Sequence, residues 1–295
     1  VCAYLAEYAV KYFGEEQLES NSFTYRLKTI LDNVMYLMKH IMEELSQSEF
    51  FVADCELKIG EDIPSYTIVL PDGHKIAVCG SVDRVDIMQR ADITYLRIID
   101  YKTGTKQFKL SDILYGINLQ MLLYLHSIEA SGGDKYGEIV PAGILYMPAT
   151  VPYISSDSLK SIDKLPDELN KKLKMNGLLL KDTEIIHGMD KTDVATYIPV
   201  KIKAGEPVSS TSLATLAEFG KIFKKVDMLI AEMGKNIYNG NIEAKPLKGG
   251  HDSCEYCPYD SVCAYRQSNP ITCFSVDNKT VIEEITNEIN GKEEE

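Results

Sequence analysis

The chain has 295 residues, 45% of them hydrophobic, which suits a soluble globular protein with one large core or two small ones. Its apolar runs, such as residues 177–180, are far too short to span a bilayer, and no signal-like segment opens the chain, so membrane and secreted proteins are disfavoured. With 31 Lys and Arg against 44 Asp and Glu, the net charge of −13 argues against strong nonspecific binding to nucleic acid by this chain alone.

The cysteine content indicates a reducing compartment. Seven cysteines, an odd number, in a chain without a secretion signal do not suggest a disulfide scaffold, so we expect a cytoplasmic protein. The chain opens with Val1 and not with methionine, which suggests a fragment of a longer protein.

The hydrophobic period changes along the chain and predicts its elements. Apolar side chains recur at three- and four-residue steps over residues 25–38, so we expect a helical segment over 1–48. The period then falls to two, which predicts strands. The expected strands cover residues 53–59, 67–70, 75–79, 81–88 and 94–100. A helix over 111–127 and a buried strand over 142–147 follow.

The C-terminal half is less regular. We expect a core over residues 49–270 that carries an insertion over 155–245 and a cysteine loop over 251–266. Helices are predicted near 166–174 and over 209–238. Residues 271–295 are expected to form a tail with a frayed end.

Two neighbouring strands carry the residues with the clearest chemistry. Gly80-Ser-Val-Asp83 lies on the first, and Asp100-Tyr101-Lys102 lies at the end of the second. Side chains alternate between the faces of a strand, so Asp100 and Lys102 share one face and Tyr101 points away. Two carboxylates and an amine held together can bind Mg²⁺ (or Mn²⁺) and orient a water molecule, which is the chemistry of phosphodiester cleavage. The simpler alternative is a surface Asp–Lys pair at a strand end.

The spacing Gly-x-x-Asp followed by Asp-x-Lys resembles that of the PD-(D/E)XK nuclease superfamily. The sequences of three segments resemble those of its RecB-type branch, namely residues 80–86, 96–104 and 116–125. Within that branch they resemble the C-terminal nuclease domain of the AddB component of AddAB-type bacterial helicase–nucleases. The resemblance covers about residues 26–266. It implies an α/β fold with a restriction-endonuclease-like core, in which a mixed central sheet is flanked by helices and extended by helical additions.

The resemblance also implies roles for the site residues. Asp83 and Asp100 would bind Mg²⁺ together with the backbone carbonyl of Tyr101. Lys102 would either orient and help deprotonate the attacking water or stabilise charge on the phosphate in the transition state. Glu56, on the first expected strand, is a further candidate acid, although we rank an outward-facing strand position ahead.

A helix downstream carries two more candidates. Gln120 and Tyr124 lie four residues apart and therefore on one helix face, and they match the Q-x-x-x-Y motif of the RecB-type branch. In that branch the glutamine helps to position the lysine or the DNA, and the tyrosine lies near the substrate. Packing of the neighbouring leucines against the sheet is an alternative explanation of the same pattern, and both can hold at once.

One expected ligand is not evident. RecB-type nucleases carry an additional histidine ligand on a helix that precedes these motifs. His40 is the histidine that precedes the first expected strand, but its helix resembles the one next to that strand and not the one that bears the ligand. A ligand upstream of Val1 would leave this site incomplete, and the fragment would then be weakly active or inactive.

Cys254-x₂-Cys257-x₅-Cys263 is similar to the segment that closes the iron–sulfur site of the family. A 4Fe–4S cluster takes four thiolates. The family's fourth cysteine lies far upstream, and Cys2 lacks its usual sequence setting. We therefore expect a 4Fe–4S cluster in the full-length parent, with a Cys₃His zinc site that uses His251, or an empty loop, as alternatives.

The site residues predict Mg²⁺-dependent cleavage of phosphodiester bonds, and the resemblance implies an exonuclease domain that cuts single-stranded DNA within a bacterial helicase–nuclease for double-strand-break repair. An AddA-like protein would be its partner, and no membrane is involved. One alternative is a CRISPR-associated RecB-like exonuclease, which the long insertion disfavours. Another is an inactive nuclease fold that binds or scaffolds DNA. The missing histidine and the acidic charge favour this second alternative, whereas the joint presence of Asp83, Asp100, Lys102 and Gln120 opposes it.

Overall fold

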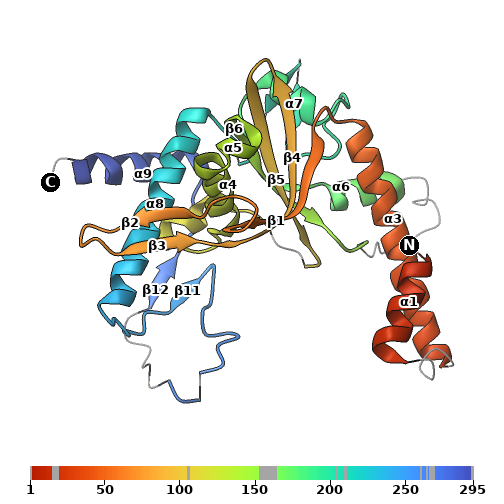
Figure 1. The fold of residues 1–295 in the computed structure, drawn as a ribbon, viewed down its shortest axis with the longest axis horizontal. Coiled ribbons are helices and arrows are strands. Elements are labelled where there is room, and N and C mark those ends of the chain that lie inside the picture. The colour runs from red at the N-terminus through yellow and green to blue at the C-terminus, as the bar shows by residue number, and fades with distance from the viewer. Residues whose placement is uncertain are drawn as a thin grey trace.

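A mixed β-sheet forms the centre of the computed structural model, which describes residues 2–14, 20–104, 107–152, 165–203, 205–208, 211–259, 261–263, 265 and 270–293 (Figure 1). Within these residues the sheet has six strands in the order β1–β4–β5–β6–β7–β10. The strands are β1 (Phe51–Ile59), β4 (Gly80–Arg90), β5 (Ile93–Lys102), β6 (Glu138–Pro148), β7 (Asn176–Leu180) and β10 (Leu213–Ala214). β1, β4 and β5 form an antiparallel meander, and β6 then joins parallel to β5.

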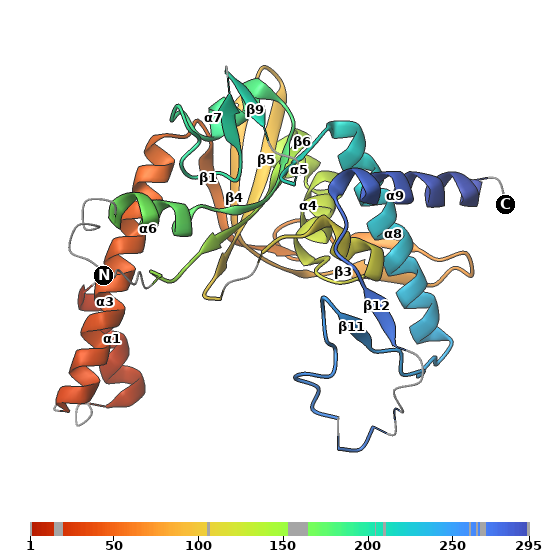
Figure 2. The ribbon, with the colours of Figure 1, turned by 180° about the vertical axis from the view of Figure 1, so that it is seen from behind.

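Helices cover both sides of this sheet. The two views place α3 on one side and α4 with α8 on the other (Figures 1 and 2). The helices are α1 (Cys2–Phe13), α3 (Asn21–Ser46), the 3₁₀ helix η1 (Leu110–Tyr115), α4 (Gln120–Ser131), α5 (Gly133–Tyr136), α6 (Leu165–Leu173), α7 (Thr183–Met189), α8 (Leu216–Tyr238) and α9 (Asn278–Glu293). No helix in the described part of the chain is both long and apolar enough to cross a membrane.

Three small strand pairs lie outside the central sheet. They are β2 (Tyr66–Val69) with β3 (Lys75–Val78), β8 (Lys201–Lys203) with β9 (Glu206–Val208), and β11 (Leu247–Gly249) with β12 (Ile271–Cys273). The β2–β3 hairpin lies against α4 and α8, so it adds a further layer to that side of the sheet (Figure 1).

The core is built on β5, which lies in the interior of the sheet between β4 and β6. Its sequence is rich in β-branched and apolar residues, which favour a strand that is covered on both faces. Ile98 and Ile99 point to opposite faces and both are fully buried. The end of β5 that carries Asp100 therefore extends from a rigid, closely packed strand.

A β-bulge in β6 sets the alignment at that end. Leu96 pairs with Pro141, whereas Arg97 pairs with Gly143, so Ala142 is one extra residue in β6. Gly143 has φ +151°, and a Cβ there would lie 2.6 Å from the carbonyl oxygen of Leu178. Only glycine fits this close approach without a shift of the neighbouring strand. Past the bulge, Asp100 pairs with Tyr146.

Four buried charges join α3 to β4 and β5. The Glu44 carboxylate of α3 accepts hydrogen bonds from Arg84 at 2.9 Å and from Arg97 at 2.6 Å. Asp86 also accepts from both guanidinium groups, at 2.6 Å from Arg84 and 2.9 Å from Arg97. Burial alone would raise the pKa of Asp86, but the two arginines hold that pKa below its ordinary value. Two positive and two negative charges thus balance inside the protein, which we call the buried charge cluster.

The predicted fold class is correct, and several element ends differ from the prediction. The five strands expected between residues 53 and 100 form, with ends within two residues of those expected. The helix expected over 111–127 is divided into η1 and α4, because Gly116 and Asn118 adopt positive φ angles of 69° and 55°. The helix expected from residue 209 begins at Leu216, where Thr215 and Glu218 form a capping box.

The expected insertion and tail contribute to the body of the protein. Residues 155–245 supply β7 and β10 to the central sheet and also supply α8. The expected tail contains α9, a helix that the prediction did not give, and the end expected to be frayed, residues 291–295, continues α9 as far as Glu293 and then lies outside the described residues. The side chains of Val281 and Ile285 in α9 are fully buried.

Candidate active site

The predicted acid–lysine pair forms at the end of β5. The Nζ atom of Lys102 lies 2.5 Å from Oδ2 of Asp100, and the two side chains are 27% and 11% exposed. Both side chains lie on one face of the strand, as the alternation predicts. Asp100 Oδ2 is buried and accepts no well-directed hydrogen bond from any described group, so this contact is an ion pair. The oxygen therefore retains lone pairs for a second cation.

Asp83 and Tyr101 come together on the same two strands. Oδ2 of Asp83 accepts a hydrogen bond of 2.9 Å from the backbone N–H of Tyr101. The N–H and C=O of one strand residue point toward the same neighbouring strand, so the Tyr101 carbonyl also faces β4. The phenol of Tyr101 points away and accepts a hydrogen bond of 3.3 Å from Arg84, which belongs to the buried charge cluster. The cluster thus anchors the strand segment that carries the site.

The donors at this end of the sheet suit a hard divalent cation. Mg²⁺ prefers oxygen ligands and usually takes one or two carboxylates while it keeps several waters. Asp83, Asp100 and the Tyr101 carbonyl supply such a set, and the buried Oδ2 of Asp100 is an oxygen without a directed partner. Among the described residues, no three His, Cys, Asp or Glu side chains are grouped to hold a metal. Within the described residues, two carboxylates and one backbone oxygen are therefore the candidate protein ligands.

The Q-x-x-x-Y pair lies at the start of α4. Nε2 of Gln120 donates a hydrogen bond of 3.4 Å to the hydroxyl of Tyr124. The Tyr124 ring occupies the space beside Gly80, where an added Cβ would lie 2.2 Å from the hydroxyl oxygen. No hydrogen bond or ion pair joins either α4 residue to Asp83, Asp100 or Lys102 among the described contacts. The structure therefore links this pair to the Gly-x-x-Asp motif and not to the acid–lysine pair.

Two alternative ligands lie elsewhere. His40 is only 5% exposed and packs against Tyr197, with 5.3 Å between ring centroids. Burial lowers its pKa against the opposing effect of Glu43 and Glu44. Glu56 is exposed, with φ +56°, and its carboxylate accepts a hydrogen bond of 3.0 Å from Ser81. Neither is grouped with Asp83 and Asp100 in the described structure.

The cysteine segment is not arranged as a metal site in the described residues. The backbone N–H of Cys257 donates to the carbonyl of Cys254 at 3.3 Å, so these two cysteines share a turn. Cys263 is exposed, and no group of three ligands forms from these cysteines and His251 within the described part of the chain. The iron–sulfur assignment therefore remains a prediction from sequence.

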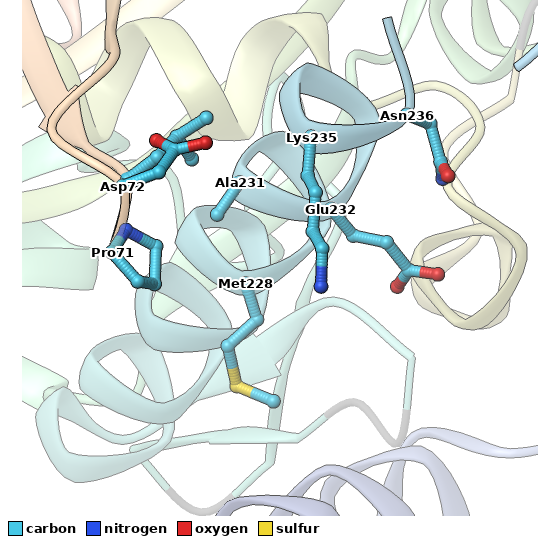
Figure 3. Close-up of a pocket in the computed structure, with 8 residues that line it drawn as sticks. Pro71, Asp72, Met228, Ala231, Glu232, Lys235 and Asn236 are labelled. Carbon is cyan, nitrogen blue, oxygen red and sulfur yellow. The ribbon is translucent and has the colours of Figure 1, made fainter. Parts of the chain in front are cut away.

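A large groove lies away from these residues. It has a volume of about 870 Å³ and is open to solvent between α8 and the turn after β2 (Figure 3). It is lined by Leu70, Pro71, Asp72, Met228, Ala231, Glu232, Lys235 and Asn236. None of the predicted site residues lines it, so size alone does not identify the reactive centre of this fold.

Tyr146 is the neighbour of the site that the sequence prediction missed. The prediction placed it in a buried strand with no further role, but its ring lies 5.6 Å from Lys102 Nζ, centroid to nitrogen. The sequence signal was a single polar hydroxyl inside the apolar run 142–147. The bulge at Gly143 determines which way this residue points, and a simple alternation cannot predict a bulge.

Comparison with known proteins agrees with the geometry. Three relatives, each named as a component of an ATP-dependent helicase/deoxyribonuclease, come from Thermoanaerobacter sp. (strain X514), Alkaliphilus oremlandii (strain OhILAs) and Clostridium kluyveri (strain NBRC 12016). They are 38%, 36% and 36% identical to this chain over 81%, 89% and 92% of its length. The chain spans 21%, 24% and 24% of the length of these relatives.

The family model described as "PD-(D/E)XK nuclease superfamily" matches residues 3–264, which include the sheet, the acid–lysine pair and the three clustered cysteines. This match covers most of the chain, and β4, β5 and α4 lie within it. The chain belongs to the PD-(D/E)XK nuclease superfamily.

Proposed function

We propose that this chain is a divalent-metal-dependent deoxyribonuclease domain that hydrolyses phosphodiester bonds of single-stranded DNA. We infer that it works within a bacterial helicase–nuclease for double-strand-break repair, together with an AddA-like partner. The observation that carries the proposal is the meeting of Asp83, Asp100 and Lys102 at adjoining ends of β4 and β5. The names of the relatives support the DNA substrate and the partner.

Each side chain has a role that follows from its position. Asp83, Asp100 and the Tyr101 carbonyl would hold Mg²⁺ or Mn²⁺. A bound divalent cation polarises a phosphoryl oxygen and lowers the pKa of a coordinated water. The Lys102 ammonium, beside Asp100, is placed to donate hydrogen bonds to the attacking water or to a phosphate oxygen that gains charge. The side chains thus combine charge stabilisation with orientation of the water.

The direct test is degradation of end-labelled single-stranded DNA in Mg²⁺ and in Mn²⁺. We expect Asp100→Ala and Lys102→Ala each to lower the rate about 100-fold or more, as loss of a charged group at a reacting centre does. Asp92→Ala and Lys75→Ala are matched controls, because both residues are exposed and lie outside the site, and they should cut like the wild type. Equal rates in all five proteins would assign the cutting to a contaminant.

An inactive DNA-binding fold is the second candidate, because the described residues supply no third side-chain ligand. Binding of single-stranded DNA in Ca²⁺ separates the two candidates. A folded wild type that binds DNA but does not cut it in Mg²⁺ or Mn²⁺ would favour the binding role. Metal-dependent cutting that requires Asp100 would exclude it.

We also propose that Cys254, Cys257 and Cys263 bind a 4Fe–4S cluster in the longer protein. Iron, sulfide and zinc analysis of anaerobically purified full-length protein tests this assignment. Iron and sulfide in equal amounts, lost in Cys254→Ser, are expected. Zinc without iron would show the Cys₃His alternative.

A further inference from the structure

Tyr146 lies beside the acid–lysine pair across the β5–β6 pairing. It is directly in register with Asp100, and on its other side it pairs with Asn176 of β7. Residues in register on neighbouring strands point to the same face, so Tyr146 shares the face of Asp100 and Lys102. Tyr146 is 2% exposed, which means that its ring is fixed by packing on all sides.

The Lys102 side chain lies close to this ring. Its Nζ atom is 2.5 Å from the carboxylate of Asp100 and 5.6 Å from the ring centroid of Tyr146. An ammonium within about 6 Å of a ring centroid is attracted by the electron-rich face of the ring. The attraction grows as water is excluded, and Lys102 is only 27% exposed.

We propose that Tyr146 is a positioning residue of this nuclease: its ring holds the Lys102 ammonium over Asp100, at the place where water and phosphate would bind. The proposal rests on the proposed function, because it assigns Lys102 to the reaction. The bulge at Gly143 is what makes it possible. Without the extra residue in β6, Leu145 would stand in register with Asp100, and Tyr146 would point to the other face.

The hydroxyl of Tyr146 stays protonated while it does this. Burial raises its pKa to about 12, with further contributions from the carboxylates of Asp100 and Asp112. Lys102 therefore faces a neutral aromatic ring at ordinary assay pH. For this reason Tyr146→Phe should preserve the restraint, whereas an aliphatic residue should remove it.

A spectroscopic test reads the position of Lys102 directly. In protein with ¹³C-labelled lysine, the ε-CH₂ signal of Lys102 is assigned by its loss in Lys102→Ala. We expect an upfield ring-current shift of this signal in the wild type and in Tyr146→Phe, and its loss in Tyr146→Leu. If Tyr146→Leu does not fold, Tyr146→Met replaces it, because methionine also lacks a ring and its flexible, unbranched side chain adapts to the space. An unshifted signal in the wild type, or the same shift in the aliphatic variants, would overturn the proposal.

The kinetic test uses the same proteins on single-stranded DNA in Mg²⁺. Tyr146→Leu should lower kcat about tenfold, the scale of one well-placed cation–π contact, with KM within about twofold of wild type. Tyr146→Phe should leave both parameters within about twofold. Tyr136→Leu is the control for lost core packing, because Tyr136 is also buried but hydrogen-bonds to Asp54. An equal loss of kcat in Tyr136→Leu would show that Tyr146→Leu acts through lost core packing and not through the position of Lys102.

The two readouts separate this inference from the proposed function. A Tyr146-dependent shift together with cutting that falls in Tyr146→Leu supports both. The same shift in this chain, together with no cutting by the full-length protein that includes the upstream segment, would refute the nuclease assignment and leave the Lys102–Tyr146 contact established. Cutting that is independent of Tyr146 would refute the positioning role alone.

Discussion

Gly80 lacks a side chain at the point where the Tyr124 ring packs against β4. A Cβ on Gly80 would lie 2.2 Å from the hydroxyl oxygen of Tyr124 and 2.6 Å from its Cζ atom. The glycine of the Gly-x-x-Asp motif and the tyrosine of the Q-x-x-x-Y motif are therefore packing partners. The pairing explains why β4 and α4 carry these two residue types, whatever part Tyr124 has in DNA binding.

Gly80→Ala should displace the Tyr124 ring and break its hydrogen bond with Gln120. We expect a loss of about 1–3 kcal/mol in the free energy of unfolding, typical of overpacking. In a Tyr124→Ala background the same substitution should cost less than about 0.5 kcal/mol, because the ring is absent. Urea denaturation of the four proteins measures this cycle. An equal cost in both backgrounds would place the strain in the backbone of β4.

The sequence identified single residues where spacing alone decides the geometry. Asp100, Tyr101 and Lys102 follow one another on one strand, and the period of two was enough to predict that Asp100 and Lys102 share a face and that Tyr101 points away. Tyr146 depends on a bulge in a third strand, and the buried charge cluster depends on where α3 docks. Such contacts are set by tertiary packing, which a local pattern does not contain.

At the scale of elements, a charged histidine connects α4, α8 and the β2–β3 hairpin. Nε2 of His126 lies 3.2 Å from the Tyr66 hydroxyl and 3.2 Å from Oδ2 of Asp227, and Nδ1 lies 3.4 Å from Glu129. Its ring stacks on Phe223, with 4.6 Å between centroids. Burial opposes protonation, but Asp227 and Glu129 outweigh it and raise the pKa of His126 to about 9. His126 holds in place the helix that carries Gln120 and Tyr124.

This set of contacts around His126 predicts a pH dependence of stability. The pKa rises from 6.5 in the unfolded chain to about 9 in the folded one, so the charged imidazole stabilises the fold fully below pH 6.5. That contribution is lost as the pH rises through about 9. We expect His126→Gln to lower the free energy of unfolding by about 2 kcal/mol at about pH 6 and by much less above about pH 9.5.

Denaturant titrations at about pH 6, 7.5 and 9.5 measure the effect. His251→Gln is the control, since His251 is exposed and lies away from His126, and it should change stability little at any of these pH values. If the difference in the free energy of unfolding between wild type and His126→Gln does not vary with pH, His126 stabilises the fold by packing and not by its charge.

At the scale of the whole molecule, α9 closes the fold. It packs against α8 and η1, and the ion pair of Lys225 with Glu288, at 2.5 Å, joins it to α8. Val281 and Ile285 are fully buried, and Ile289 is 7% exposed. The terminal position of this segment suggested a tail with a frayed end. Three apolar residues four apart were the signal of a helix that docks.

A protein that ends after Val276 should lose about 4 kcal/mol or more in the free energy of unfolding, since each buried aliphatic side chain contributes about 1.5–3 kcal/mol. Glu288→Gln should cost about 1–3 kcal/mol, because it leaves the buried Lys225 ammonium without its carboxylate partner and keeps the apolar contact. Thermal denaturation of both variants compares the two contributions. If the shortened protein had the same melting temperature as the wild type, α9 would contribute nothing to the stability of the core.

The buried charge cluster also favours the correct alignment of β4 with β5 during folding. Arg84 and Asp86 are on β4, and Arg97 is on β5, so Glu44 can satisfy both arginines only when these strands align correctly. A slip of one residue in β4 would turn Arg84 and Asp86, which bond to each other, to the opposite, apolar side. The cluster would then divide into two pairs, and the hydrogen bonds from Arg84 to Glu44 and from Arg97 to Asp86 would be lost. The charges on this face of the sheet therefore favour the alignment that places Asp83 beside Asp100 on the other face.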